Sequence, residues 1–256
     1  YALVHYGEQM DLVNLFQSSK RNISVAELNN AEAMMEYQFA KTIDRMVYPQ
    51  RPTVVYSSGN GEPTGPETID MVQTIGANYN FNLFNLNFQP YIPGPDTISV
   101  LMIVKPASEF SEAEKLKIDQ FVMKGGRVLW FIDNLFAEPD SLTFKDKLIA
   151  YERNLNLHDL LFNYGVRINP DLLMDLQCDF LPFVVGGSES DPQYEFLHWN
   201  YYPLFESSNN HIINKNIGLV AGRFVNSIDT IETESVRKTI LLKSSSNSRT
   251  ISTPAL

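Results

Sequence analysis

The sequence predicts an α/β fold, in which an open, mostly parallel β-sheet carries helices on both faces. Residues 98–104 and 127–133 are continuous apolar runs, typical of strands that are covered on both sides. Between them lies a helical segment that begins after Ser111 and ends at Gly125 and Gly126. A strand, a helix and a second strand in this order form a βαβ unit, so we expect parallel strands with a right-handed crossover.

The N-terminal region, residues 1–49, predicts a hairpin followed by a long helix. Apolar residues flank Gly7 within residues 1–20, although a strand followed by a helical turn fits nearly as well. Across residues 27–47 apolar side chains recur at helical spacing, and Pro49 and Pro52 end the helix. We expect this stripe to face the core, and a groove for a partner helix is the alternative. The stripe consists of Ala31, Met34, Met35, Phe39, Ile43 and Met46.

The remaining chain predicts an α/β domain over residues 50–243, with a possible subdivision near residue 151. Residues 53–56 and 81–88 read as strands, with a helix over 65–76 between them. Beyond residue 151 the pattern is less regular, and the polar residues 244–256 predict a linker. In this half we expect a helix over 157–164, strands over 172–176, 182–185, 217–225 and 239–242, and a loop over 186–192.

Composition excludes several classes of protein. The chain has 256 residues, of which 44% are hydrophobic and 20% charged, as in globular proteins of one or two domains. A net charge of −10 disfavours nucleic acid as a partner, because an acidic chain repels phosphates. A single cysteine excludes an internal disulfide framework and a zinc site built on cysteines. We also expect the chain to be part of a longer protein, with any membrane anchor outside these residues.

A candidate binding crevice lies where three predicted strands end. In open α/β sheets, ligands bind beyond the carboxyl ends of the strands. Two acidic side chains there, Glu62 and Asp133, are placed to pair with Lys105 or to bind a polar ligand. The alternative is a tight turn with satisfied charges. The candidate site consists of Ser58, Gly59, Asn60, Gly61, Glu62, Lys105 and Asp133.

The sequence contains only weak signals for a catalytic nucleophile or a metal site. Cys178 lies between apolar runs without the turn that exposes a nucleophile, so we expect a buried structural cysteine. The four histidines lack the spacing of metal ligands, so neither a metal nor a cofactor is expected. The aromatic residues Trp199, Tyr201 and Tyr202 are consistent with core or loop-anchoring packing, or with a surface for a partner or a glycan.

Ten short stretches, taken in order, resemble a known family over nearly the whole chain. They include a glycine loop at residues 59–62 and an apolar strand at the end of residues 125–133. The remaining stretches are residues 36–43, 51–56, 105–106, 110–112, 118–121, 155–161, 164–167 and 175–178. The family is that of the gliding-motility-associated ABC transporter auxiliary protein of Bacteroidetes (GldG-type). Its members typically carry His where Asn60 stands. Because asparagine does not exchange protons as histidine does, the resemblance implies no proton-transfer role for this loop.

The resemblance implies an extracytoplasmic domain at the periplasmic face of the bacterial inner membrane, tethered by membrane helices outside these residues. It implies a permease subunit and a cytoplasmic ATPase as partners. Related domains resemble flavodoxin-like or amidotransferase-like three-layer sandwiches without catalytic residues, and the family is often described as substrate-binding.

Three hypotheses follow. The first is a non-catalytic module of an ABC transporter associated with gliding motility or export, which acts by protein contacts and ligand binding. The second is a glycan- or peptide-binding module, based on the aromatic cluster and the glycine loop. The third is a hydrolase that uses Glu62, Lys105 or Asp133.

Overall fold

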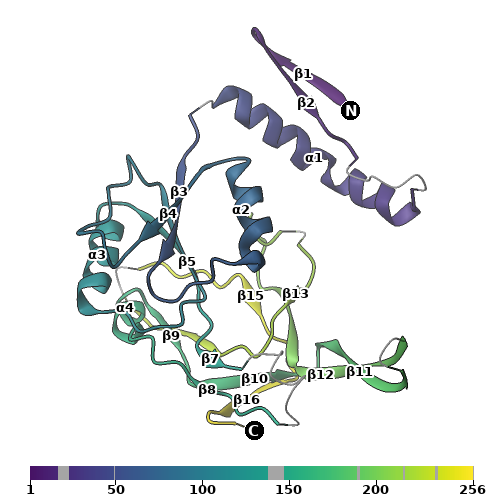
Figure 1. Ribbon diagram of the computed structural model, residues 1–256, viewed down its shortest axis with the longest axis vertical. Coiled ribbons are helices and arrows are strands. Elements are labelled where there is room, and N and C mark those ends of the chain that lie inside the picture. Colours follow the sequence, from purple (N-terminus) through teal and green to yellow (C-terminus); the bar gives the residue numbers. More distant parts are fainter. Residues whose placement is uncertain are drawn as a thin grey trace.

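The computed structural model in Figure 1 describes residues 1–16, 23–48, 50–137, 147–188, 191–215, 217–233 and 236–255. Three parts follow one another along the chain. An N-terminal unit of a hairpin and a long helix stands at the top of the view, a parallel sheet with its helices lies below it, and antiparallel strands fill the lower half.

The central sheet has four strands in the order β4-β3-β5-β6, and every neighbouring pair is parallel. Its members are β3 (Thr53–Ser58), β4 (Asn80–Asn85), β5 (Val100–Val104) and β6 (Arg127–Phe131). The order places β3 and β5 in the middle, and these two strands have the most completely buried residues. The predicted open parallel sheet is confirmed, within a chain of mixed strands and helices.

Helices cover both faces of this sheet. On one face, α2 (Ile69–Gly76) follows the short 3-10 helix η1 (Pro66–Thr68), and Met71 and Ile75 of α2 pack on a cluster that includes Tyr56. On the other face, α3 (Glu112–Met123) and α4 (His158–Asn163) pack on the larger cluster. The alternation of neighbouring β3 residues between the two clusters follows from the two-residue period of a strand. The finer flavodoxin-like or amidotransferase-like three-layer arrangement stays a prediction.

The start and the end of α3 follow its sequence signals. Ser111 Oγ accepts a hydrogen bond from the Glu114 amide at 3.3 Å, and Glu114 Oε2 accepts one from the Ser111 amide at 2.7 Å. This reciprocal capping box satisfies two amides that have no partner within the helix. After the helix, Gly125 has a φ of +91°, and a Cβ atom on Gly126 would lie 2.4 Å from Cζ of Phe121. Both glycines are therefore required where the chain turns into β6.

The N-terminal unit consists of β1 (Ala2–Tyr6), β2 (Gln9–Val13) and α1 (Val25–Val47). The two strands pair antiparallel, which confirms the predicted hairpin, and the long helix is also confirmed. Ser24 and Glu27 form a capping box at the start of α1. Pro49, which we expected to end this helix, lies outside the described residues.

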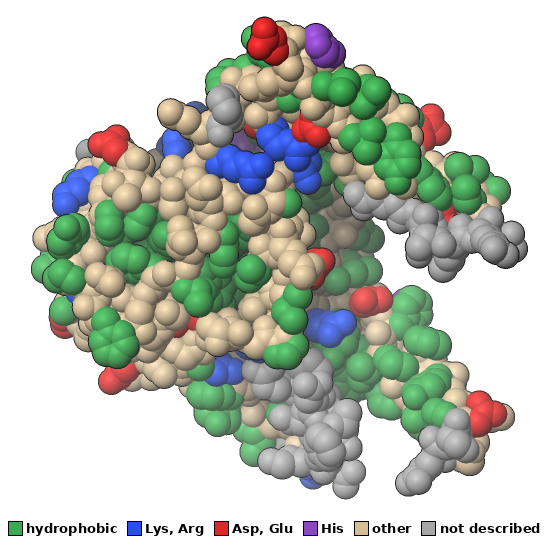
Figure 2. Space-filling view, turned by 45° about the horizontal axis from the view of Figure 1, so that its top comes forward, with side chains coloured by type: hydrophobic (Ala, Val, Ile, Leu, Met, Phe, Trp, Pro, Cys, Tyr) green, Lys and Arg blue, Asp and Glu red, His purple; other side chains and the backbone are tan. Residues whose placement is uncertain are grey.

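The apolar stripe of α1 is largely exposed, so the prediction that it faces the core is wrong for most of its length. Met34, Met35 and Ile43 are each more than 40% exposed, whereas Met46 is buried. Figure 2 shows hydrophobic side chains over this unit at the top of the view. Helical spacing identifies which face of a helix is apolar, but it does not identify what covers that face. The alternative of a partner-helix groove stays a prediction.

The second half of the described chain is built from short antiparallel pairings and one long hairpin. β11 and β12 form this hairpin, the arm at the lower right of Figure 1. The strands are β7 (Leu135–Phe136), β8 (Tyr151–Glu152), β9 (Val166–Ile168), β10 (Asp171–Asp175), β11 (Cys178–Ser188), β12 (Asp191–Ser207), β13 (Val220–Ala221), β14 (Ile228–Thr230), β15 (Leu242–Lys243) and β16 (Ser248–Ser252). A second core, which includes Leu135, Leu172, Tyr202 and Phe224, lies among them.

Several predictions for this half need correction. The loop expected over 186–192 belongs largely to the hairpin, because β11 runs to Ser188 and β12 begins at Asp191; residues 189–190 lie outside the described residues. The strands expected over 217–225 and 239–242 shrink to the two-residue β13 and β15. Of the described residues in these regions, only the two of β13 and the two of β15 pair with β12, because β-propensity alone does not provide a partner strand.

The polar linker predicted over 244–256 is wrong for residues 248–252, which form β16 and pair antiparallel with β10. Buried Asp175 holds the start of this segment: it accepts hydrogen bonds from the Ser245 amide at 2.8 Å and from the Gln177 amide at 2.9 Å. Serine-rich composition indicates a linker only when its hydroxyl and amide groups have no partner in the fold, and here they have one.

Candidate functional site

The glycine loop at the carboxyl end of β3 turns its polar side chains inward. Asn60 and Glu62 are 2% and 7% exposed. Glu62 Oε2 accepts a hydrogen bond from the Asn60 amide at 2.8 Å, and the Asn60 carbonyl accepts bonds from the Ala107 and Ser108 amides at 2.8 Å each. The loop is therefore a tight turn with internal partners, the alternative that the sequence left open.

The two glycines of this loop, Gly59 and Gly61, have φ angles of +127° and +77°. A Cβ atom on Gly59 would lie 2.8 Å from Nδ2 of Asn87, whose side chain donates to the Gly59 carbonyl. The glycines thus serve the turn and its close contact with the segment after β4. Ser58, which precedes them, ends β3 and is half-buried.

Beneath the loop, three buried oxygen atoms have no hydrogen-bond partner among the described residues: Ser57 Oγ, Asn60 Oδ1 and Glu62 Oε1. Buried polar atoms normally have partners, so this cluster holds unused hydrogen-bonding capacity. The described residues contain no group of three or more His, Cys, Asp and Glu side chains that could hold a metal ion.

Lys105 and Asp133 lie at the ends of the neighbouring strands β5 and β6 and form an ion pair, with Lys105 Nζ 3.6 Å from Asp133 Oδ2. The expected pairing of Asp133 with Lys105 is confirmed. Lys105 adopts a φ of +45°, unusual for a residue with a side chain. Because both side chains are partly exposed, the pair contributes little to stability. Asp133 also lines a cavity.

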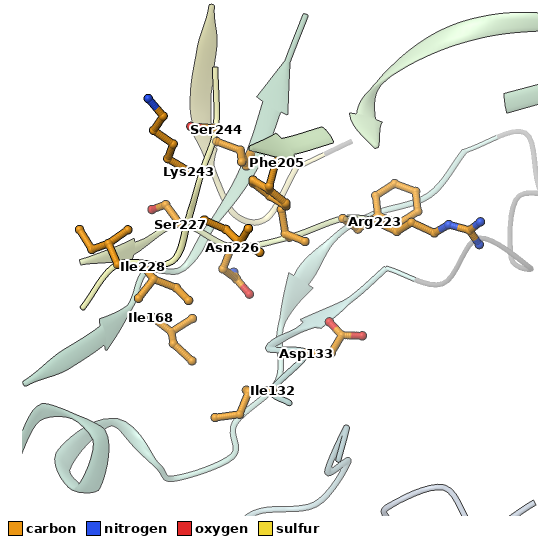
Figure 3. Close-up of a pocket in the computed structure, with 15 residues that line it drawn as sticks. Ile132, Asp133, Ile168, Phe205, Arg223, Asn226, Ser227, Ile228, Lys243 and Ser244 are labelled. Atoms are coloured by element: carbon orange, nitrogen blue, oxygen red, sulfur yellow. The ribbon is translucent and has the colours of Figure 1, made fainter. Parts of the chain in front are cut away.

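A cavity of about 650 Å³ lies beside Asp133, between the carboxyl end of β6 and the antiparallel strands (Figure 3). Of the residues predicted for the site, Asp133 lines this cavity, whereas the glycine loop and Lys105 do not. Phe205, Asn226 and Ser227 also line it. Sequence reasoning missed them, because they come from segments whose contacts with β6 and β10 are long-range and carry no local signal.

Two polar side chains of the cavity, Asn226 and Ser227, donate hydrogen bonds to neighbouring parts of the fold. Asn226 Nδ2 donates to the carbonyl oxygens of Asn169 at 3.0 Å and Asp171 at 2.8 Å. Ser227 Oγ donates to Asp171 Oδ2 at 2.6 Å. These bonds fix the wall that faces Asp133 in Figure 3 and leave a surface that is chiefly apolar.

Cys178 is buried, as expected, and is not activated as a nucleophile. Its Sγ atom lies 3.9 Å from His198 Nδ1 and 3.8 Å from Asn200 Oδ1. Burial, followed by the negative charge of Asp175, raises the pKa of the thiol. A thiol whose pKa is raised holds its proton at neutral pH, and the thiolate is the reactive form.

The aromatic cluster is divided between the core and the surface. Tyr202 is buried in the second core, where its ring meets Phe224 edge-on, so Tyr202 offers no surface to a partner. Trp199 and Tyr201 are half-buried and pack against the same core. For Tyr202, the structure therefore supports core packing, which the sequence left open as an alternative.

Among the described residues, no helix combines the length and apolarity that a span across a bilayer requires. No curated protein matches the sequence. A solved structure titled "mmIFT52 N-terminal domain" is 13% identical, covers 77% of this chain and 74% of its own, and superposes with a TM-score of 0.49. A likeness this low supports no statement about function.

A family model described as "ABC-type uncharacterized transport system" matches residues 51–256, which begin just before β3 and include the parallel sheet and the antiparallel strands. The N-terminal unit lies outside this match. Because the match covers most of the chain, the protein belongs to the family of ABC-type uncharacterized transport systems, and its role is that of an accessory component of such a system.

Proposed function

We propose that the chain is a non-catalytic, extracytoplasmic module of an ABC transporter auxiliary subunit, at the periplasmic face of a bacterial inner membrane. In this proposal it contacts a permease subunit and, through it, a cytoplasmic ATPase, in a system for export or gliding motility. The family match over residues 51–256 is the observation that carries the proposal. The cavity beside Asp133 is its proposed ligand site.

The chemistry of the site supports a role without catalysis. The pKa of the Cys178 thiol is raised, Glu62 serves the turn of its own loop, and Asp133 is paired with Lys105. A hydrolase that uses Glu62, Lys105 or Asp133 would bring its acid and its base to one reacting atom. Instead, Glu62 accepts a hydrogen bond within its own loop, and Lys105 and Asp133 pair with each other.

Co-purification tests the proposed partners. The full-length protein, tagged and extracted in a mild detergent, should retain the permease encoded with it, and the ATPase should follow. A tagged membrane protein of similar abundance is the control. Absence of the permease from the eluate under conditions that preserve other transporter complexes would contradict the proposal.

Cysteine labelling in intact cells tests the proposed location. Lys124 is exposed just after α3, and the native Cys178 is buried, so a Lys124→Cys substitution in the full-length protein introduces one reactive thiol. A maleimide that does not cross the inner membrane should label this thiol as completely before cell lysis as after it. Labelling only after lysis would place the domain in the cytoplasm.

A further inference from the structure

The cavity beside Asp133 lies at the junction of the two halves of the fold. Ile132 and Asp133 come from the carboxyl end of β6, and the opposite wall comes from the strands and loops between β9 and β15. Its volume of about 650 Å³ falls within the range of about 300–1,000 Å³ that small-molecule sites occupy. The position also agrees with the tendency of open α/β sheets to bind ligands beyond their strand ends.

The lining of the cavity is mostly apolar. Aliphatic and phenylalanine side chains form most of its wall, among them Ile132, Ile168, Leu173, Phe205 and Leu242. The amide nitrogen of Asn226 and the hydroxyl of Ser227 donate to Asp171 and Asn169, as described above. A sugar would bring many hydroxyl groups into this space, and each buried hydroxyl left without a hydrogen-bond partner weakens binding. An apolar ligand body fits these walls better than a glycan does.

Two cationic side chains stand at the rim. Arg223 and Lys243 are exposed residues of the lining, and Figure 3 shows their charged heads at its opposite ends, directed outward. No salt bridge within the described part of the chain joins either head to a carboxylate. The guanidinium carbon of Arg223 lies 5.3 Å from the centre of the Tyr202 ring. Asp133 is held by Lys105, and Glu206 lies opposite Lys243 in the β12–β15 pairing without an ion pair.

We propose that this cavity binds an anionic amphiphile. The apolar body of the ligand occupies the space between Ile132 and Phe205, and a carboxylate or phosphate head is held at the rim by Arg223 or Lys243. Charge-assisted hydrogen bonds from arginine or lysine to such acids are stronger than neutral ones, and arginine matches their geometry. The inference rests on the ligand-binding part of the proposed function and does not depend on the permease.

Calorimetric titration of the purified chain tests the proposal with five probes. The ionic amphiphiles are kept below their critical micelle concentrations, and dodecanol is kept below its solubility limit. Dodecanoate and dodecyl phosphate carry an acid on an alkyl chain, dodecanol is neutral, dodecyltrimethylammonium is cationic, and maltohexaose is a glycan. Both acids should bind one site at least about tenfold more tightly than dodecanol. Comparison of the two acids identifies the head group that the rim prefers. Maltohexaose and the cationic probe should give no saturable heat.

Charge reversal at the rim should weaken binding of both acids. The double variant Arg223→Glu and Lys243→Glu should bind dodecanoate at least about tenfold more weakly, with dodecanol unchanged. Lys124→Glu and Arg127→Glu make the same charge change at the other end of β6 and should change affinity less than about twofold. The single variants Arg223→Gln and Lys243→Gln test the same point if the double variant unfolds, which circular dichroism would reveal.

Four results would overturn the inference: equal affinity for dodecanol and the acids, binding of maltohexaose alone, an equal loss in the control variant, or no binding of any probe. These results are distinct from failure of the proposed function. Loss of co-purification with the permease would leave the titration unchanged, and a flat titration would leave the co-purification unchanged.

Discussion

Lys115 of α3 and Asp159 of α4 form an ion pair between the two helices that cover the same face of the sheet. Lys115 Nζ lies 2.8 Å from Asp159 Oδ2 and 2.6 Å from Glu112 Oε1, and the Lys115 side chain is almost completely buried. Burial alone would lower the pKa of Lys115, but the hydrogen bonds with Asp159 and Glu112 outweigh it, so this pKa is raised. The same bond with Lys115 lowers the pKa of Asp159.

This pair predicts a pH dependence of stability. Because the pKa of Asp159 is lowered in the folded state, its contribution is complete above the ordinary value of 3.8 and is lost as the pH falls through the lowered pKa. Asp159→Asn should reduce the free energy of unfolding by about 1 kcal/mol at pH 7, with the difference shrinking below pH 4. Urea denaturation at several pH values measures it. Asp96→Asn, at an exposed loop residue, is the control. A difference that persists unchanged to pH 2 would contradict this account.

Alanine substitutions in the core and in the apolar stripe of α1 should differ sharply in their effect on the free energy of unfolding. Phe121 of α3 is fully buried, whereas Met35 of α1 is 41% exposed. Phe121→Ala should lower the free energy of unfolding by about 3–5 kcal/mol, because it removes buried apolar area and leaves a cavity. Met35→Ala should change it by less than about 0.5 kcal/mol. Equilibrium unfolding in urea compares the two. A large loss in the Met35 variant would show that the stripe is covered in solution.

The contact between Asp175 and Ser245 should control the turn before β16. Asp175→Ala leaves the half-buried Ser245 and Gln177 amides without their acceptor, which should cost about 1 kcal/mol. Limited proteolysis should then cut within residues 244–247 several times faster than in the parent protein. Asp179→Ala removes a bond to the amide of the next residue only, and serves as control. Equal cleavage rates in the two variants would show that Asp175 does not fix this turn.

Cys178 should react slowly with thiol reagents in the folded protein. Burial raises the pKa of its thiol, so the thiolate fraction at pH 7 is small, and the side chain is also sheltered from solvent. Modification by a disulfide reagent should be many-fold slower than in guanidinium chloride, and its rate should keep rising with pH beyond the point where that of an ordinary thiol levels off. Fast native labelling at neutral pH would show an activated thiol next to His198 and reopen the case for catalysis.

The parallel sheet could be predicted because its signals are local. Continuous apolar strands, the Ser111 capping box and the glycines after α3 each agree with the same βαβ unit. The pairing of Lys105 with Asp133 followed from strand ends that meet at one edge.

What the sequence could not reveal depends on contacts between distant residues. Asp175 and Ser245 are 70 residues apart, so no local pattern distinguishes the turn that they fix from a free linker. The cavity wall likewise joins Ile132 to residues as far along the chain as Ser244. The exposed stripe of α1 has the same period as a buried one, and only tertiary structure separates the two cases.

The hydrogen bond that holds the glycine loop to β3 has a mechanical consequence. Tyr56 at the centre of the sheet donates to the Pro63 carbonyl at 2.6 Å, and burial together with the charges of Glu62 and Glu67 raises its pKa to about 12. The phenol therefore keeps its proton, and so this anchor, throughout the physiological range. Because this hydrogen bond ties residues 59–63 to the central strand β3, a force applied to the loop would move the loop and the sheet together.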